Sequence, residues 1–133
     1  MPDQPKIRVV VSVIEKNGRY LITRRRPTAV LPLLWEFPGG KVEPGETDAQ
    51  ALKREMKERL DADVEVGDLI TNKDHAYEGY TIALYVYSAK LLSPELTVKA
   101  VHEFKWVRSD EFDQYPFPPV DQATVDKLLG FGQ

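Results

Sequence analysis

A chain of 133 residues, 42% hydrophobic and 10% aromatic, is long enough to bury a core, and we expect a single domain over residues 1–133. Cysteine is absent, which excludes disulfides and thiolate metal sites and leaves carboxylates, two histidines and backbone oxygens as ligands for a hard metal ion. The net charge of −3 disfavours bulk nucleic-acid binding, although three arginines at residues 24–26 allow a local phosphate contact.

The N-terminal residues favour a cytoplasmic protein with no membrane partner. They lack a charged start followed by a long apolar region, and the apolar run at residues 9–14 is too short to span a bilayer. The sequence does not decide the oligomeric state, and a homodimer is left open.

Two paired strands are predicted first along the chain. Residues 7–14 are rich in β-branched side chains, Asn17 and Gly18 form a strong hairpin signal, and residues 19–25 return behind this turn. The three prolines within residues 26–40 then predict a loop, with at most a short strand at residues 35–37.

An α-helix is predicted from Asp48 to Leu60. Thr47 and Gln50 have the spacing of a capping box, and the segment that follows is dense in strong helix formers. At 100° per residue, the apolar stripe of this helix consists of Ala49, Leu52, Met56 and Leu60. An acidic side lies beside it and consists of Asp48, Glu55 and Glu58, interrupted by the cationic Arg59.

Further strands are predicted at residues 62–70, 80–90 and 104–107. A closing helix is predicted after the prolines of residues 116–119; it includes Val125, Leu128 and Leu129 and ends at Gly130. This order of elements indicates the α/β class, with a mixed β-sheet covered by helices on both sides as an α/β/α sandwich.

Glu55 and Glu58 stand at i and i+3 of the predicted helix, so both carboxylates can reach one hard cation. The glycines at residues 39–40 allow a backbone carbonyl to complete the shell. Mg²⁺ suits such a site because it accepts few protein ligands and bridges to substrate phosphates, which points to chemistry on a pyrophosphate. The plain alternative is a solvated acidic face paired with neighbouring lysines and arginines.

The segment from Gly40 to Ala62 resembles the signature of the Nudix hydrolases. Six positions match that signature at the required spacings, namely Gly40, Glu46, Arg54, Glu55, Met56 and Glu58. The preceding residues 34–40 and the hairpin-first order are similar to the MutT and CTP pyrophosphohydrolase branch, so the resemblance extends over nearly the whole chain.

The resemblance implies a Nudix-type sandwich that hydrolyses a nucleoside diphosphate linked to another group, often a nucleoside triphosphate cut to monophosphate and pyrophosphate, with Mg²⁺ or Mn²⁺. By position, it implies that the Gly40 carbonyl, Glu55 and Glu58 are metal ligands. It also implies that Arg54 and Glu46 form an ion pair that holds the loop against the helix.

Two expected acids are absent from this chain. Arg59 stands where the signature has a second adjacent glutamate, and at i+4 it can pair with Glu55 across the position of a cation. Ala100 stands six residues before a late tryptophan, where the family commonly has another acid. Glu103, Glu43 or Glu46 are candidates to take over as ligand or base. The chain is then an enzyme with fewer metal ions, a weakened enzyme, or a nucleotide-binding protein that has lost catalysis.

Three residues are candidates for nucleotide contacts by their match to the MutT-like branch. Arg25 matches a nucleotide contact and Phe37 a position lining the base pocket, with a surface arginine and a core aromatic as plain alternatives. Asp121 stands at a base-reading position, and its carboxylate would accept a hydrogen bond from an exocyclic amine; a helix cap is the alternative. Oxidised purine or cytosine (d)NTPs are the expected substrates, with a nucleotide sugar or non-catalytic nucleotide sensing as rivals.

Overall fold

The computed structural model describes residues 5–29, 32–118 and 123–125. Its elements in chain order are β1 (Lys6–Lys16), β2 (Arg19–Arg24), β3 (Trp35–Glu36), β4 (Gly39–Lys41), α1 (Asp48–Leu60), β5 (Val64–Tyr77), β6 (Tyr80–Leu91), β7 (Glu103–Val107) and the 3-10 helix η1 (Ser109–Gln114). Within these residues, no helix is long and apolar enough to cross a membrane.

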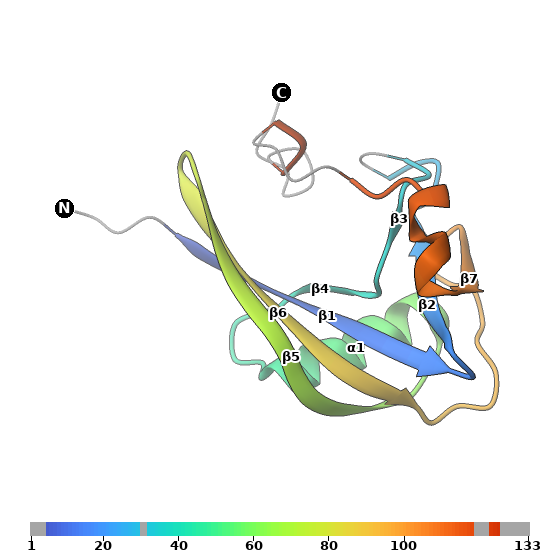
Figure 1. Cartoon of the computed structure of the whole chain (residues 1–133). Helices are drawn as coiled ribbons and strands as arrows, with labels where there is room; N and C mark the ends of the chain where they lie inside the picture. Colours follow the sequence, from blue (N-terminus) through green and yellow to red (C-terminus); the bar gives the residue numbers. More distant parts are fainter. Residues whose placement is uncertain (1–4, 30–31, 119–122, 126–133) are drawn as a thin grey trace.

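The strands form a mixed sheet in which β1 joins two halves. The strand order is β3-β2-β1-β6-β5, with β4 paired to β1 and β7 paired to β2. β1 runs parallel to β6, whereas the other pairings are antiparallel. Figure 1 shows β5 and β6 as a long curved ribbon and α1 lying across the same half of the sheet. The predicted mixed sheet and α/β class are confirmed, while the end of the closing helix lies outside the described residues.

The predicted hairpin is present between β1 and β2. Asn17 and Gly18 both have positive φ, 54° and 77°, which is the backbone that a tight two-residue turn requires. Lys16 pairs with Arg19 across the turn. Alternation along β1 then divides its side chains between two faces, because successive residues of a strand point to opposite sides.

Helix α1 has the predicted bounds and the predicted start. The Thr47 hydroxyl accepts from the Gln50 N–H at 3.1 Å, and the Gln50 side chain accepts from the Thr47 N–H at 2.9 Å. Asp61, which stands where the family signature has glycine, ends the helix in the left-handed region at φ 50°. A short polar residue therefore supplies this C-terminal turn.

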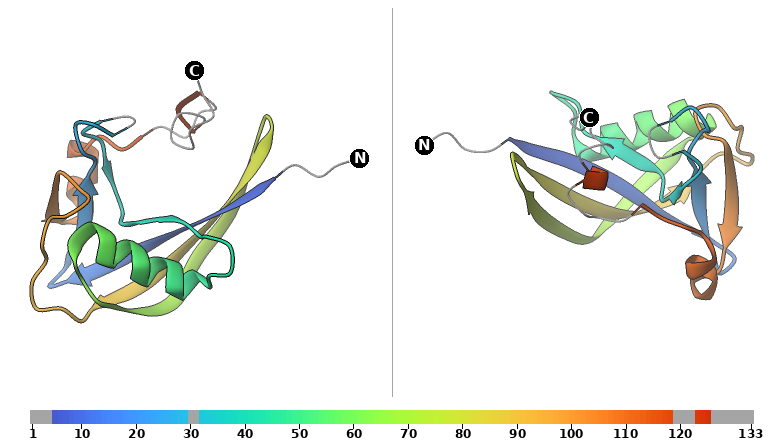
Figure 2. Two further views of the ribbon diagram at one scale, coloured as in Figure 1. Left: turned by 180° about the vertical axis from the view of Figure 1, so that it is seen from behind. Right: turned by 90° about the horizontal axis from the view of Figure 1, so that it is seen from above.

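The buried face of α1 differs slightly from the prediction. Leu52, Met56 and Leu60 are fully buried as expected, but Ala51 is buried with them, whereas Ala49 is only half-buried. Ala51 is buried because it packs with Leu52 and with Val10 of β1 in one apolar cluster. Figure 2, left, shows α1 in front of the strands on which it packs.

Two strand predictions need correction. β5 continues to Tyr77, beyond the expected end at residue 70, because β6 pairs with it along its whole length. The added residues are largely exposed and carry no apolar alternation, so their strand conformation comes from cross-strand pairing. The prolines predict a loop that includes Gly39 and Gly40, but these residues belong to β4, which pairs with residues 9–11 of β1.

Candidate functional site

The loop before α1 is tied to the helix by Arg54. Its Nε donates to Glu46 Oε2 at 2.7 Å and its Nη2 to Glu46 Oε1 at 3.0 Å, so the expected ion pair is present and bidentate. Nη2 also donates to the Lys41 carbonyl at 3.0 Å. The hydrogen bond from Arg54, with a second one from the Glu43 N–H, lowers the pKa of the Glu46 carboxyl. Arg54 thus connects α1 to β4 and to the loop.

Glu55 is a buried carboxylate held by two arginines. It is 8% exposed; its Oε1 accepts from Arg54 Nη1 at 2.9 Å and its Oε2 from Arg59 Nε at 2.8 Å. Gly40 lies directly against it, because a Cβ on Gly40 would stand 2.7 Å from the Glu55 carboxyl carbon. Glycine is needed here for the close approach of β4 to this carboxylate.

Glu58 faces solvent on the other side of Arg54. Its Oε2 is 3.4 Å from Arg54 Nη1, and its side chain is 57% exposed. The helical spacing therefore places Glu55 and Glu58 around the same arginine. A cation shared by the two glutamates would have to bind Glu55, but both oxygens of that carboxylate are bonded to the guanidinium groups of Arg54 and Arg59.

A cavity of about 650 Å³ opens beside Glu55. It is bounded by β1, β4, the loop before α1 and the tip of the β5–β6 ribbon, and Val125 of the closing helix reaches it. Of the residues expected at the site, this cavity brings together five, namely Gly40, Glu43, Glu55, Arg25 and Phe37. Its lining includes four aliphatic side chains and charged side chains of both signs, namely Val9, Val11, Ile82, Leu84, Arg25, Glu36, Lys41, Glu43, Glu55 and Arg59. A mostly apolar lining with a few charged groups is typical of a site for a small molecule.

Other expected site residues lie elsewhere. Glu103 on β7 pairs with Arg24, whose Nη1 is 3.1 Å from Glu103 Oε2, and it does not line the cavity. The Ala100 N–H donates to the Arg59 carbonyl at 3.1 Å, so this segment does run beside α1. Asp121 lies outside the described residues.

The cavity also has an aromatic wall that the sequence reasoning missed. His75 and Tyr77 of β5 line it, and their rings are stacked with centroids 6.1 Å apart. Both positions lie beyond residue 70, where the predicted strand ends. The available signal was the i, i+2 spacing of two rings, which places both on one face of a strand.

The residues beside Glu55 do not fit a divalent ion as they are arranged. Both Glu55 oxygens accept hydrogen bonds from arginines, and Arg59 stands in place of an acidic ligand. Within residues 5–29, 32–118 and 123–125, no cluster of three or more acidic or histidine side chains is suited to a metal. The role of Mg²⁺ or Mn²⁺ in this chain therefore stays a prediction.

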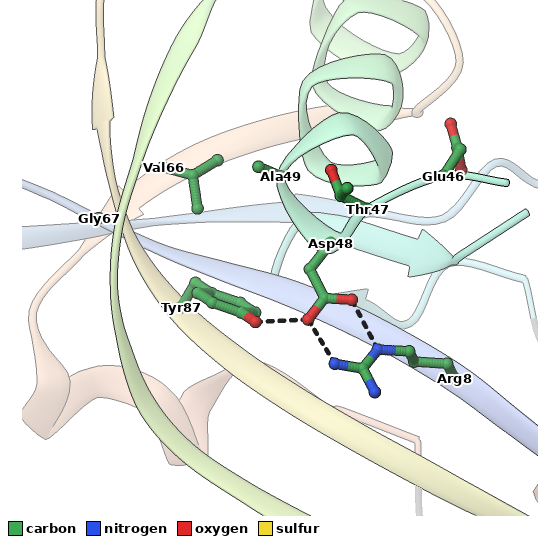
Figure 3. A pocket seen from close by; sticks show the side chains of 8 residues that line it. All are labelled: Arg8, Glu46, Thr47, Asp48, Ala49, Val66, Gly67 and Tyr87. Atoms are coloured by element: carbon green, nitrogen blue, oxygen red, sulfur yellow. Dashed lines mark hydrogen bonds and ion pairs between the residues drawn. The ribbon is translucent and has the colours of Figure 1, made fainter.

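A second hollow of about 550 Å³ lies at the start of α1 (Figure 3). Asp48 accepts two hydrogen bonds from Arg8, from Nε at 2.6 Å and from Nη2 at 2.7 Å, and the Tyr87 hydroxyl donates to the same carboxylate. The hydrogen bond from Arg8 lowers the pKa of the Asp48 carboxyl, and burial raises that of Tyr87. These three side chains satisfy one another and connect the helix start to β1 and β6.

The NUDIX domain model matches residues 9–127. The chain is 34% identical over 123 residues to the CTP pyrophosphohydrolase of Escherichia coli K12, covering 92% of this chain and 91% of the relative. It is 28% identical to the 8-oxo-dGTP diphosphatase of the same organism, covering 92% and 96%. The solution structure of the E. coli ORF135 protein superposes with a TM-score of 0.74 at 30% identity, covering 96% of this chain and 91% of that one.

These matches agree with the geometry around Gly40, Glu46, Arg54 and Glu55, where the fixed spacings of the signature become a single contact network. The family model spans both the hairpin at the start of the sheet and the cavity-lining residue Val125. The chain belongs to the Nudix hydrolase family.

Proposed function

We propose that this chain is a MutT-type nucleoside triphosphate pyrophosphohydrolase that cuts (d)NTPs to a monophosphate and pyrophosphate. The cavity beside Glu55 supports this proposal, because its lining combines apolar and aromatic side chains with the cationic Arg25 and Arg59. The named activities of the relatives, on CTP and on 8-oxo-dGTP, make cytosine and oxidised purine nucleotides the first candidates. We also propose that the protein acts in the cytoplasm.

Each site residue has a proposed role. Phe37 lies in the cavity with a position suited to a base, and Arg25, whose Nη1 is 2.9 Å from Glu36 Oε1, lies where it can meet a phosphate. Glu55 is the carboxylate next to the phosphate end, and Glu46 with Arg54 holds the loop around it. In the reaction, water adds to one phosphorus of the diphosphate linkage and the bridging oxygen leaves with the other phosphate.

We infer a weakened enzyme, because Arg59 is paired with the one carboxylate that lines the phosphate end from α1. In the family, a divalent ion at this helix supplies positive charge to the developing transition state, and the loss of one ligand lowers turnover by orders of magnitude. Gly40 and Glu58 are the remaining predicted ligands. The Arg59→Glu variant would restore the acid and is expected to raise turnover with Mg²⁺ or Mn²⁺.

A pyrophosphate-release assay tests the proposal. The panel contains CTP, dCTP, dGTP, 8-oxo-dGTP and a nucleotide sugar, each with Mg²⁺, Mn²⁺ or EDTA, and the Glu55→Gln variant serves as the inactive control. We expect slow release from one class of triphosphate that Glu55→Gln abolishes. Cleavage of the nucleotide sugar alone would replace the triphosphate assignment. Thermal stabilisation by nucleotides without any cleavage, by the wild type and by Arg59→Glu, would identify a non-catalytic sensor.

A further inference from the structure

Arg59 occupies an unusual place for a cation on this helix. It stands one turn after Glu55, bonds that carboxylate through Nε at 2.8 Å, and lines the cavity. The pair is well shielded, with the two side chains 25% and 10% exposed. Within the described part of the chain, the hydrogen bonds of Arg59 side-chain nitrogens use only Nε. The two terminal nitrogens of the guanidinium remain for another acceptor.

Two departures from the family pattern change the charge near Glu55, although of the two residues only Arg59 lines the cavity. Arg59 and Ala100 stand where the family has acids, so two expected negative charges are replaced by one positive charge. A site with the full set of acids repels a diphosphate until metal ions are bound. Here the positive charge belongs to the chain itself, and Arg25, which directly follows β2, lines the same cavity as Arg59.

The chemistry of guanidinium suits this position better than that of an ammonium. Its planar fork presents parallel N–H groups that match two phosphate oxygens, while the Nε edge can bond a carboxylate at the same time. The Nε bond to Glu55 therefore leaves the fork of terminal N–H groups for a phosphate. A divalent ion at Glu55 would have to displace this ion pair first.

We infer that Arg59 replaces the divalent cation at Glu55, so that this chain binds the diphosphate group of a nucleotide through Arg59 and Arg25 without a metal ion at that carboxylate. The inference rests on the proposed function in one respect, namely that the cavity is the nucleotide site. It goes beyond that proposal by naming Arg59, and not a metal ion, as the cation at Glu55. Binding measurements can test this point without any turnover.

Two binding measurements test this inference. The first is calorimetric titration with α,β-methylene-CTP, a non-hydrolysable analogue, in EDTA and again in Mg²⁺. The second is the free Mn²⁺ signal in electron paramagnetic resonance without nucleotide. Arg59→Glu and Arg59→Gln are the test variants. Lys53→Glu is the matched control, because it places the same charge change on an exposed position of α1 outside the cavity.

The wild type is expected to bind the analogue in EDTA with an affinity within about twofold of that in Mg²⁺, and to leave the Mn²⁺ signal unchanged. Both Arg59 variants are expected to lose about tenfold or more of the affinity in EDTA, as for loss of a hydrogen bond to a charged group. Arg59→Glu alone is expected to bind Mn²⁺. Lys53→Glu is expected to behave as the wild type.

The inference is overturned if the wild type binds the analogue only with a divalent ion, or binds Mn²⁺ as tightly as Arg59→Glu does. It is also overturned if Arg59→Gln keeps the wild-type affinity in EDTA. In these cases metal-dependent cleavage by the wild type would leave the proposed function intact. Absence of analogue binding under every condition, together with absence of cleavage, would remove both.

Discussion

Replacing Gly40 by alanine tests how closely β4 must approach the central carboxylate. A Cβ at this position would stand 2.7 Å from the Glu55 carboxyl carbon and 2.8 and 2.9 Å from its two oxygens. Ordinary contact begins at 3.4 Å, so the carboxyl carbon must retreat by about 0.7 Å. Because arginines hold both oxygens, through bonds of 2.8 and 2.9 Å, the carboxylate cannot move that far without straining them.

The expected cost combines two known effects. Forcing extra volume into a packed region costs about 1–3 kcal/mol, and losing a hydrogen bond to a charged group costs about 1.5–3 kcal/mol. Since Glu55 can relax partly, we expect Gly40→Ala to lower the free energy of unfolding by about 2 kcal/mol. Urea denaturation followed by circular dichroism measures this change, with an unchanged m value as the check on two-state behaviour.

Repeating Gly40→Ala in a Glu55→Ala variant separates the clash with the carboxylate from any effect of the new Cβ on the backbone of β4. With the carboxylate removed, Gly40→Ala meets no obstacle there and is expected to be neutral or to stabilise by about 0.4–1 kcal/mol through the unfolded chain. The coupling between the two substitutions should therefore be about 2–3 kcal/mol. An equal cost of Gly40→Ala in both backgrounds would refute the reasoning.

Three further changes probe other parts of the molecule. Arg25→Gln is expected to raise the KM for the triphosphate about tenfold, whereas Arg24→Gln, which alters a neighbour outside the cavity, should not; equal effects would argue against a phosphate contact. Leu52→Ala should cost about 3 kcal/mol in urea denaturation because the side chain is fully buried, and a loss no larger than that of the exposed Lys53→Ala would contradict the packing of α1. The pKa of Asp48 is lowered by its arginine partner, so its stabilisation is fully present above the ordinary aspartate pKa of about 4 and lost as pH falls through the folded value. The stability difference between wild type and Asp48→Asn should accordingly shrink in acid, and a constant difference from pH 7 to about pH 3 would exclude this linkage.

Local chemistry explains the parts of the fold that the sequence predicts well. The bounds of α1 follow from Thr47 and Gln50, whose side chains bond each other's backbone within one helical turn. The first hairpin follows from Asn17 and Gly18, which both accept positive φ. The pairing of Arg59 with Glu55 is likewise a property of i, i+4 spacing on one helix. Each of these features needs only neighbours close in sequence.

The parts that sequence reasoning missed depend on partners far along the chain. Residues 39–41 become a strand because β1 supplies hydrogen bonds, and residues 71–77 because β6 does. The same long-range pairing carries His75 and Tyr77 into the cavity. Propensity could not show this, since exposed polar residues pair as strands only where a neighbouring strand is already in place.

Most of the signature residues in this chain contact one carboxylate, that of Glu55, or hold a residue that does. Arg54 bonds Glu46 and Glu55 at once, so the distance in sequence between loop and helix is set by the reach of one guanidinium. Gly40 allows β4 to close over that carboxylate, and Arg59 bonds its second oxygen. A buried carboxylate needs positive charge nearby in any state of the site. Arg54 and Arg59 supply this charge from the chain itself and hold the two oxygens of Glu55 in one orientation.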